Sequence, residues 1–344
     1  MRAIVKRLPA PGVEVADVPK PRPGPGEVVI EVQAAAICGS DLGIYRYTEA
    51  YSGMKLPVVL GHELAGVVSE VGPGVEGVEP GERVVSESVW SCGECQMCLG
   101  GHPNLCEDTK VLGIHIDGGF AEYVKVPERL LHPIPQHLGF DQAALVEPLS
   151  NAVHFVHDLT PFQEGDLVVV QGCGPIGLLS AQLFQLGGAQ VLVSGLESDG
   201  VRLAIAGELG LETVVVGRED LVERVMDETG GRGADVAFVA VGAPQAAQQA
   251  IQLVKKRGRV TLVGIFEEPT PLDLTRVVRR EVSLHGAYDA KPPNFQASID
   301  LITRGRVEVG KLITHRFPLE KAEEAFQTAL NRLGGKILFK PQQG

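Results

Sequence analysis

Residues 167–177 read LVVVQGCGPIG, and this stretch decides how the second half of the chain folds. An apolar strand, Leu167–Gln171, runs into a glycine-rich turn, and a helical pattern from Pro175 to Leu186 follows. In such a turn the first glycine makes the tight bend, the second admits a pyrophosphate to the backbone, and the third lets the helix pack on the strand. The helix N-terminus then faces the phosphates. We therefore predict a dinucleotide site formed by Gly172, Gly174, Pro175, Ile176 and Gly177.

Short apolar runs continue to alternate with longer amphipathic segments beyond this turn. That alternation predicts a parallel sheet covered by helices, and six strands complete a doubly wound sheet. On its own the glycine turn would indicate only a strand-to-helix connection, because glycine-rich turns are common. Cys173, inside the turn, is expected to be a small apolar filler. The predicted strands are 167–171, 190–194, 213–216, 235–241, 259–263 and 282–285.

The choice between NAD and NADP is expected to lie just after the second strand. An acid there accepts a hydrogen bond from the adenosine ribose and favours NAD, whereas a cation there favours the 2'-phosphate of NADP. Glu197 and Asp199 are the candidate acids, although neither directly follows the predicted strand end at Ser194, and Arg202 is the candidate cation. Both acids are equally compatible with a solvated turn or a helix cap.

Residues 1 to about 150 follow a different pattern, rich in Gly and Pro. Short apolar runs at 27–32 and 64–71 lie between turn signals and predict an all-β module whose loops carry its chemistry. After residue 288 the chain shows helical patterns at 294–304 and 319–330 and a terminal strand at 335–339. We expect this tail to return to the first module.

Four cysteines gather in one short loop. Cys92, Cys95, Cys98 and Cys106 have the spacing C-x2-C-x2-C-x7-C, which lets one loop present four thiolates to a tetrahedral ion. An iron-sulfur cluster is the main alternative, but ferredoxin spacing continues with x3 and a proline, whereas Glu107 follows Cys106 here. A closed site of four thiolates has no open coordination position, so the spacing predicts a structural zinc ion.

A second set of possible metal ligands lies outside that loop. Cys38, the pair His62-Glu63, and Glu147 supply a sulfur, an imidazole nitrogen and carboxylate oxygens. Each residue alone has an ordinary structural explanation, such as a buried cysteine or a helix-starting glutamate. Together they form the mixed donor set of a catalytic zinc ion that keeps one position for substrate.

Composition excludes several classes of partner. The net charge of -12 repels nucleic acid and anionic lipid. The first residues contain no signal peptide, and nowhere do about eighteen uncharged apolar residues run together. We therefore expect a cytoplasmic protein without nucleic-acid or membrane partners. Apolar residues make up 44% of the chain, so it is expected to fold throughout.

These motifs, in this order, resemble the zinc-containing medium-chain dehydrogenase/reductase family, particularly its polyol and threonine dehydrogenase branches. The resemblance covers nearly the whole chain and includes 61–63, 118–123, 147–149, the four-cysteine loop and the glycine loop. It implies an α/β protein with a GroES-like, β-rich catalytic domain, 1–152 and 288–344, interrupted by a Rossmann domain, 153–287. It also implies one catalytic and one structural zinc ion, NAD or NADP as the second cofactor, and assembly as a homo-oligomer, either tetramer or dimer.

The resemblance assigns further roles within the first module. Ser40 matches the family's proton-relay hydroxyl, and either Glu63 or Glu147 matches the carboxylate ligand, so we retain both. Relatives often carry His three residues after the relay hydroxyl, whereas this chain has Gly43, and the nearby Tyr45 and Tyr47 have no assigned role. The family reaction is hydride exchange between an alcohol and NAD(P), in which zinc stabilises the alkoxide.

The substrate is less well defined by the sequence. Residues 286–290 lack the Arg-Tyr pair of sorbitol-oxidising members, so sorbitol itself is not expected. We expect a secondary alcohol of a polyol or a sugar-derived compound, with L-threonine 3-dehydrogenase activity as the alternative. A zinc-free quinone reductase would lack Cys38, His62 and the four cysteines. The alternative outside enzymes is a nucleotide-binding protein that has lost catalysis, for which Gly43 is the only support.

Overall fold

A computed structural model of the chain describes residues 1–343 and divides them into two compact units. Unit 1 comprises Met1–Ser150, Ala290–Gly305 and Leu312–Gly344, and unit 2 comprises Asn151–Asp289 and Arg306–Lys311. The sequence had placed the boundaries at 152/153 and 287/288. Residues 306–311 group with unit 2, where the backbone N–H of Glu308 donates to Gln182 and the Lys311 ammonium donates to the Glu208 carbonyl.

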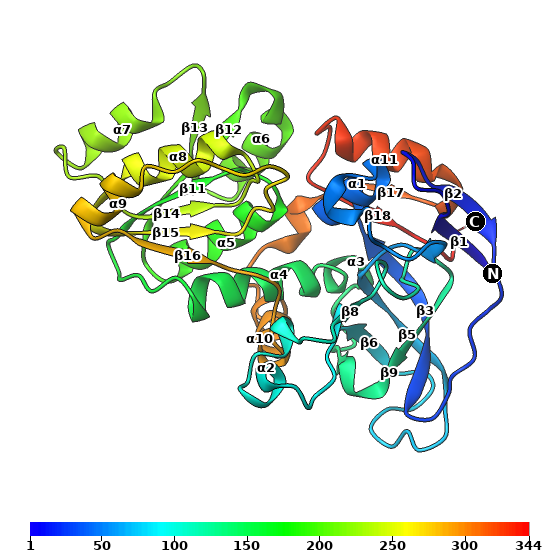
Figure 1. Cartoon of the computed structure of the whole chain (residues 1–344). Helices are drawn as coiled ribbons and strands as arrows, with labels where there is room; N and C mark the ends of the chain where they lie inside the picture. Colours follow the sequence, from blue (N-terminus) through cyan, green and yellow to red (C-terminus); the bar gives the residue numbers. More distant parts are fainter. Residues whose placement is uncertain (344) are drawn as a thin grey trace. The chain divides into compact units, whose positions relative to one another are not determined.

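Unit 2 contains the predicted doubly wound sheet. Its six parallel strands lie in the order β13-β12-β11-β14-β15-β16, with helices on both faces (Figure 1). The strands are β11 Leu167–Gln171, β12 Gln190–Leu196, β13 Glu212–Val216, β14 Ala234–Val239, β15 Val254–Leu262 and β16 Ser283–Gly286. The helices are α5 Pro175–Leu186, α6 Gly200–Glu208, α7 Leu221–Glu228, α8 Pro244–Leu253 and α9 Leu274–Arg280. A single π-helical turn, His154–Asp158, precedes the sheet in the chain.

Burial explains why these strands read as continuous apolar runs. Every residue of β11 is buried, because the central strand of a parallel sheet is covered on both faces. β12 extends two residues beyond the predicted end at Ser194, and its pairing with β13 continues to Leu196 opposite Val216. This extension moves the end of the second strand to the residue just before Glu197.

Unit 1 is built mainly on antiparallel sheets. A seven-stranded sheet has the order β10-β6-β5-β3-β18-β17, with β9 also paired to β3, and smaller sheets join β2-β1-β4 and β7-β8. The strands before the four-cysteine loop are β1 Arg2–Lys6, β2 Glu14–Asp17, β3 Glu27–Ala36, β4 Val58–Val59, β5 Glu63–Val71, β6 Arg83–Ser86 and β7 Val89–Trp90. Those after it are β8 Lys110–Val111, β9 Tyr123–Pro127, β10 Leu131–Pro133, β17 Ile313–Phe317 and β18 Lys336–Phe339.

Helices complete unit 1, so it is not the all-β module that the sequence predicted. They are α1 Gly39–Arg46, α2 Gln96–Leu99, α3 Phe140–Ala143, α4 Val146–Val153, α10 Pro292–Thr303 and α11 Ala322–Leu330. The short α1 lacked a clear apolar period in the sequence because it contains Gly39, Asp41 and Gly43. α4 continues past the end of unit 1 at Ser150.

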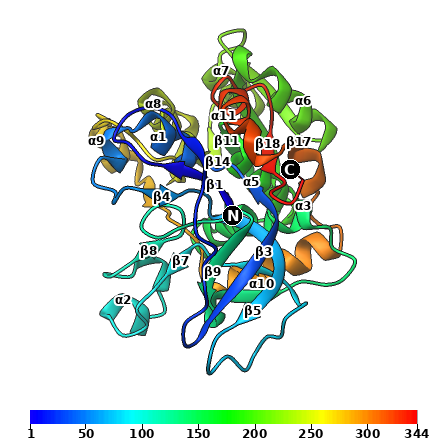
Figure 2. The same ribbon diagram turned by 90° about the vertical axis from the view of Figure 1, so that its right-hand side faces the viewer.

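The chain's tail returns to unit 1, as predicted. β18 pairs antiparallel with β3, placing Leu338 opposite Ala36, and β17 pairs with β18. In Figure 2, β17 and β18 lie near the C-terminus and β1 near the N-terminus of the same unit. Phe120, Phe326 and Phe339 pack against one another in its core, with ring centroids 4.9 Å apart for the pair Phe120 and Phe339.

Candidate metal centre and cofactor loop

The pairing of β3 with β5 brings Cys38 and His62 together. Ala36, the last residue of β3, lies opposite Glu63, the first residue of β5, so the residues just beyond these ends become neighbours. The ligand atoms of Cys38, His62 and Glu63 all lie within 4.8 Å of one another, and His62 and Glu63 are buried. Residues 24 and 25 positions apart in the chain thus form one cluster of sulfur, nitrogen and oxygen donors.

Asp41 supports this cluster from the first turn of α1. Its Oδ2 accepts from the backbone N–H of Cys38 at 2.9 Å, and its Oδ1 lies 4.0 Å from Nδ1 of His62. Neither Oδ1 of Asp41 nor Nδ1 of His62 has a hydrogen-bond partner among residues 1–343. A metal ion bound to the other ring nitrogen of His62 would leave Nδ1–H directed at Asp41, the arrangement that commonly supports metal-bound histidine. The donor set therefore fits a zinc ion.

Burial and neighbouring charge act in opposite directions on His62. Burial alone lowers the pKa of His62, but Cys38 and Asp41 raise it, and the net pKa lies well above the ordinary value. Burial also raises the pKa of Asp41. A metal ion binding to His62 must displace its proton, so the affinity of the site for metal is expected to fall as the pH is lowered.

Glu147 lies in the first turn of α4 and is also buried. Its Oε1 accepts from the Ser88 hydroxyl at 2.9 Å, and its charge acts on both His62 and Lys336. It does not belong to the group of Cys38, His62 and Glu63 whose ligand atoms lie within 4.8 Å. Glu63 thus belongs to the cluster, whereas Glu147 lies outside this group and acts on His62 through its charge.

Lys336 is the part of this site that the sequence analysis missed. It is the first residue of β18, only 2% exposed, and its ammonium donates to both carboxylate oxygens of Glu63 and to the Ile37 carbonyl. Burial lowers the pKa of Lys336, but Glu63 and Cys38 raise it above the ordinary value, so the ammonium stays charged. The available signal was a lysine at the start of the otherwise apolar strand 336–339.

The four cysteines form a second, compact cluster. It includes the N-cap and a residue of α2, a helix that lies beside β7 and β8 in Figure 2. Their sulfur atoms are 3.6 Å apart for Cys92 and Cys106, and 3.9 Å for Cys92 and Cys98 and for Cys95 and Cys106. A tetrahedral zinc ion with Zn–S bonds of about 2.3 Å requires sulfur separations of about 3.8 Å. The cage therefore matches one ion and leaves no room for several iron atoms between the thiolates.

The thiol pKa values show why this cage needs a cation. Backbone N–H groups of Glu107 and Cys98 lower the pKa of Cys95 to about 6, whereas burial raises the pKa of Cys98 to about 12. In the metal-free loop the four thiols cannot all ionise near neutral pH. A divalent cation supplies the positive charge that four adjacent thiolates require.

In unit 2, the glycine loop has the geometry that a dinucleotide requires. Gly172 has φ +105°, a Cβ on Gly174 would meet no atom within 4 Å, and a Cβ on Gly177 would lie 1.9 Å from the Gly172 carbonyl oxygen. These are the tight turn, the open backbone and the close helix packing of the fingerprint. Gly174 is the N-cap of α5, whose first residues are Pro175 and Ile176. Cys173 is buried, in keeping with its predicted role as a filler.

The candidate ribose residues have different environments. Glu197 directly follows β12, and its side chain is 72% exposed and paired with Arg218, a residue that the sequence analysis did not consider. Asp199 is buried and accepts from the backbone N–H of Leu196 at 3.0 Å, which makes it a cap of this turn. Arg202 lies 3.8 Å from Asp199. Glu197 is thus the acid at the end of β12. The shorter predicted strand had placed this residue beyond the strand end.

Comparison with known proteins agrees with the assignments made in each unit. Residues 24–136 match the model of the alcohol dehydrogenase GroES-like domain, and residues 175–304 match that of the zinc-binding dehydrogenases. The chain is 37% identical to sorbitol dehydrogenase of Halalkalibacterium halodurans, covering 99% of both chains, and 38% identical to L-threonine 3-dehydrogenase of Pyrococcus abyssi, covering 98% of both. The solved structure of 2R,3R-butanediol dehydrogenase from Bacillus subtilis has a TM-score of 0.89, 33% identity, and 99% of both chains covered.

The chain belongs to the zinc-containing medium-chain dehydrogenase/reductase family. It is a zinc-dependent oxidoreductase that exchanges a hydride between an alcohol and NAD(P). The GroES-like and Rossmann folds expected from the resemblance are both confirmed.

The two metal clusters predict separable losses. Cys95→Ser should remove the metal of the four-cysteine loop and lower the unfolding temperature, while the folded fraction keeps most of its turnover. Cys38→Ser should remove the other metal and abolish turnover, while the nucleotide still binds. Zinc per chain, unfolding temperature and NAD(P)H formation measure the three effects. Full turnover by metal-poor Cys38→Ser protein would contradict the assignment of the mixed cluster.

Without Lys336, the buried carboxylate of Glu63 should depend on a bound metal ion to neutralise its charge. In Lys336→Met the buried carboxylate loses its cation, and breaking such a pair costs about 3–5 kcal/mol. We expect the metal-free protein to lose stability by this order and zinc to restore more stability than it does in the wild type. Chemical unfolding with and without zinc measures both. Lys321→Met, which breaks an exposed pair with Glu324, is the control and should cost under about 1 kcal/mol. Equal losses in the two variants would show that the Lys336 pair has no special role.

Proposed function

We propose that the chain oxidises a secondary alcohol of a polyol or sugar-derived compound, or reduces the matching ketone, at the cluster of Cys38, His62 and Glu63. The observation that carries this proposal is the convergence of three donors of different types within 4.8 Å, two of them buried and Cys38 half-buried. A catalytic zinc site differs from the closed thiolate cage in keeping one coordination position for substrate. The alternative of a nucleotide-binding protein without catalysis rests on Gly43 alone, and the intact donor cluster and glycine loop argue against it.

The residues of unit 1 have distinct roles in this reaction. Cys38 and His62 hold the metal in either ligand arrangement, with Glu63 or Glu147 as the carboxylate ligand. Asp41 orients the His62 ring, and Lys336 neutralises Glu63. A zinc ion held there would act as a Lewis acid on the substrate hydroxyl and would lower its pKa, as zinc does for water in carbonic anhydrase, where the pKa falls to about 7. Ser40, whose Oγ lies 3.5 Å from Nε2 of His62, accepts the hydroxyl proton.

L-threonine 3-dehydrogenase activity is the second candidate. Several relatives carry that name at 38% identity, against 37% for a sorbitol dehydrogenase, and identities this close do not separate the two substrates. The absence of an Arg-Tyr pair in 286–290 argues against sorbitol itself. We therefore propose that the substrate is a secondary alcohol flanked by further polar groups, with polyols as the first candidates.

Glu197 is proposed to select NAD. Related structures hold NADP in a protein of Sinorhizobium meliloti 1021 and NADH in one of Escherichia coli CFT073, each 32% identical to this chain, so the fold accepts both cofactors. A carboxylate at the tip of β12 accepts from the ribose 2'-hydroxyl but repels a 2'-phosphate. Arg218, paired with Glu197, is the cation closest to that acid and the residue through which NADP would be retained.

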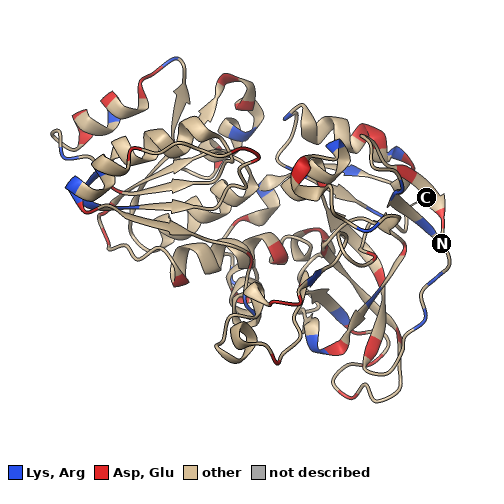
Figure 3. Ribbon diagram, viewed as in Figure 1, with Lys and Arg blue, Asp and Glu red and all other residues tan. Residues whose placement is uncertain are grey.

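A cytoplasmic homo-oligomer without nucleic-acid or membrane partners is also proposed. Figure 3 shows acidic and basic residues along the ribbon of each unit, and the chain carries a net charge of -12. Within residues 1–343 no helix is both long and apolar enough to cross a membrane. β16 is an edge strand, and the nearby apolar side chains of Leu274 and Val278 on α9 are exposed, which supports contact with a second copy.

A substrate panel tests the proposed activity. Polyols, sugar acids, L-threonine and simple alcohols are each supplied with NAD and with NADP, and the nicotinamide absorbance is followed. We expect the highest kcat/KM for a polyol or sugar-derived secondary alcohol. A higher kcat/KM for L-threonine would replace the first candidate by the second, and no turnover in zinc-loaded protein would contradict the proposal altogether.

Cofactor choice is tested by substitutions at the tip of β12. Glu197→Gln should weaken NAD about ten- to a hundredfold, because a charge-assisted hydrogen bond contributes about 1.5–3 kcal/mol. Arg218→Ala should weaken NADP, and Arg202→Ala, the other candidate cation, should weaken it less because its guanidinium faces Asp199. Titration of each variant with both cofactors measures the NAD/NADP ratio, and an unchanged ratio in Glu197→Gln would contradict the placement.

Gly195→Asp, which the sequence alone suggests as a test of this pocket, does not fit the structure. A Cβ at Gly195 would lie 2.6 Å from Sγ of Cys173 and 3.0 Å from Cδ2 of Leu203. The substitution would therefore disturb the packing beneath the glycine loop as well as the charge near the ribose. Glu197 and Arg218 are exposed and can be changed without that effect.

A further inference from the structure

Unit 1 holds a cavity of about 640 Å³ that the metal cluster does not line. Small-molecule sites typically have volumes of about 300–1,000 Å³. The cavity lies among β1, β4 and β9, which Figure 2 shows near the N-terminus, and its lining falls within residues 1–125. Cys38, His62 and Glu63 are not part of that lining. The cavity is therefore a candidate site separate from the proposed catalytic one.

The floor of the cavity, formed by Val5, Val58 and Val59, is apolar. These three side chains belong to the paired strands β1 and β4 and are each at most 4% exposed. The backbone N–H of Val59 donates to Oδ1 of Asp117 at 2.9 Å, and the N–H of Gly118 donates to the Val59 carbonyl at 2.8 Å. The floor is thus fixed in place, and the apolar part of a ligand would leave water by resting on it.

One wall of the cavity, residues 18–21, is held in place before any ligand arrives. Met1 and Val18 exchange two hydrogen bonds through their main-chain groups, each of 2.9 Å. Prolines on both sides of Lys20 restrict the backbone, and the Lys20 ammonium lies 4.0 Å from the centre of the Tyr123 ring. A preformed wall spares a ligand the cost of ordering it.

The cavity carries an excess of positive charge in a chain whose net charge is -12. Four cations and two acids line it: Arg7, Lys20, Lys55, Lys125, Glu27 and Asp117. Glu27 is paired with Lys125 at 2.8 Å, and Asp117 is bonded to the floor. Lys20 pairs with Glu70 outside the cavity, but both side chains are exposed, and exposed pairs contribute little. Lys55 forms no ion pair within residues 1–343.

His115 adds a neutral hydrogen-bond donor to this lining. Its Nδ1 accepts from the backbone N–H of Val111 at 3.0 Å, so Nε2 carries the proton of the neutral ring. The side chain is exposed and lines the cavity. Lys20, Lys55 and His115 therefore offer N–H groups beside an apolar floor.

We propose that this cavity binds a small organic anion. Its carboxylate or phosphate group meets the N–H groups of Lys20, Lys55 and His115, and its apolar part rests on the floor. Hydrogen bonds from cations to anionic oxygens are stronger than those between neutral groups. The site uses neither the metal ligands nor the glycine loop, so the inference does not depend on the proposed function.

The single tryptophan of the chain reports on this site. Trp90 is half-buried and lines the cavity, so an entering ligand should change its fluorescence. Phenyl phosphate and benzoate join an apolar ring to a phosphate or a carboxylate, whereas inorganic phosphate lacks the ring and benzamide lacks the charge. We expect the better of the two ring-bearing anions to saturate with a Kd of about 1 mM or below, and inorganic phosphate and benzamide to bind at least about tenfold more weakly.

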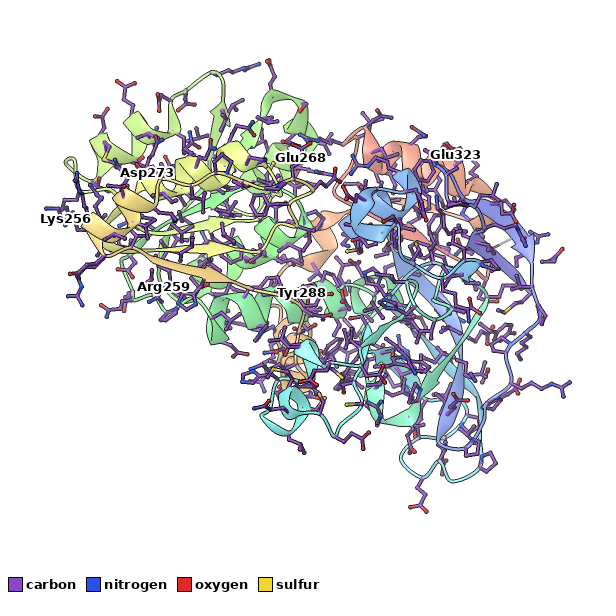
Figure 4. The ribbon with its side chains drawn as sticks, viewed as in Figure 1. Lys256, Arg259, Glu268, Asp273, Tyr288 and Glu323 are labelled. Atoms are coloured by element: carbon purple, nitrogen blue, oxygen red, sulfur yellow. The ribbon has the colours of Figure 1, made fainter. Side chains whose placement is uncertain are left out.

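Substitutions locate the bound anion. Lys55→Gln and Lys20→Gln should each weaken binding about three- to tenfold, because each removes one charged donor. Lys110→Gln is the control, since Lys110 lies opposite Trp90 in the pairing of β7 with β8 but does not line the cavity. Lys256→Gln, at an exposed residue of unit 2 labelled in Figure 4, is a second control. Both controls should leave the affinity unchanged.

The absence of a saturable fluorescence change with both ring-bearing anions would overturn the proposal, as would equal weakening in the control variants. Inorganic phosphate or benzamide binding as tightly as those anions would overturn the proposed class of ligand. Light scattering during the titration gives the oligomeric state. Binding confined to dissociated protein would show that a second copy covers the cavity and would also overturn the proposal.

Cys38→Ser separates this inference from the proposed function. This variant should lose turnover and the metal of the mixed cluster, yet bind the anion with the affinity of the wild type. Loss of anion binding in Cys38→Ser would place the anion at the metal instead of in the cavity and would overturn the inference. A wild type that oxidises no alcohol but binds the anion would overturn the proposed function alone.

Discussion

The structure of unit 1 depends on one buried set of charges at the ends of β3, β5 and β18. Glu63 and Lys336 are 273 residues apart in the chain and pair where almost no water reaches them. Breaking this pair would leave an unpaired buried charge and destabilise the fold by several kcal/mol, so the pair ties the C-terminal segment to unit 1. This constraint accounts for a catalytic unit made of separate stretches of chain, and for a metal site with cationic support that no local motif contains.

The two units contribute different kinds of site. In unit 2 the backbone forms most of the dinucleotide site, because the glycine loop offers a tight turn, an open approach for the pyrophosphate and a helix N-terminus. In unit 1 side chains supply the donors, and strand register decides which of them meet. The four-cysteine cage is closed by its own thiolates, so it stabilises a loop, whereas the cluster of Cys38, His62 and Glu63 mixes donor types beside the Ser40 hydroxyl.

Much of this architecture could be predicted because its signals are local. The six strands, the glycine loop and the four-cysteine spacing each lie within short segments whose pattern is enough to define them. Lys336 and Arg218 could not be predicted, because strand pairing brings their partners to them. β12 was predicted two residues too short, since Gly195 interrupts the apolar run, and this error hid the position of Glu197 at the strand tip.

The central claim is that hydride transfer requires the metal held by Cys38 and His62 and does not require chemistry at the four-cysteine loop. The most direct measurement uses a secondary alcohol with deuterium on its carbinol carbon and protein whose zinc content has been counted. Protein with two zinc ions per chain should deliver deuterium to the nicotinamide ring. Protein that keeps only the four-cysteine zinc should deliver none and should recover when zinc is added back. Undiminished deuterium transfer by the stripped protein would contradict this account.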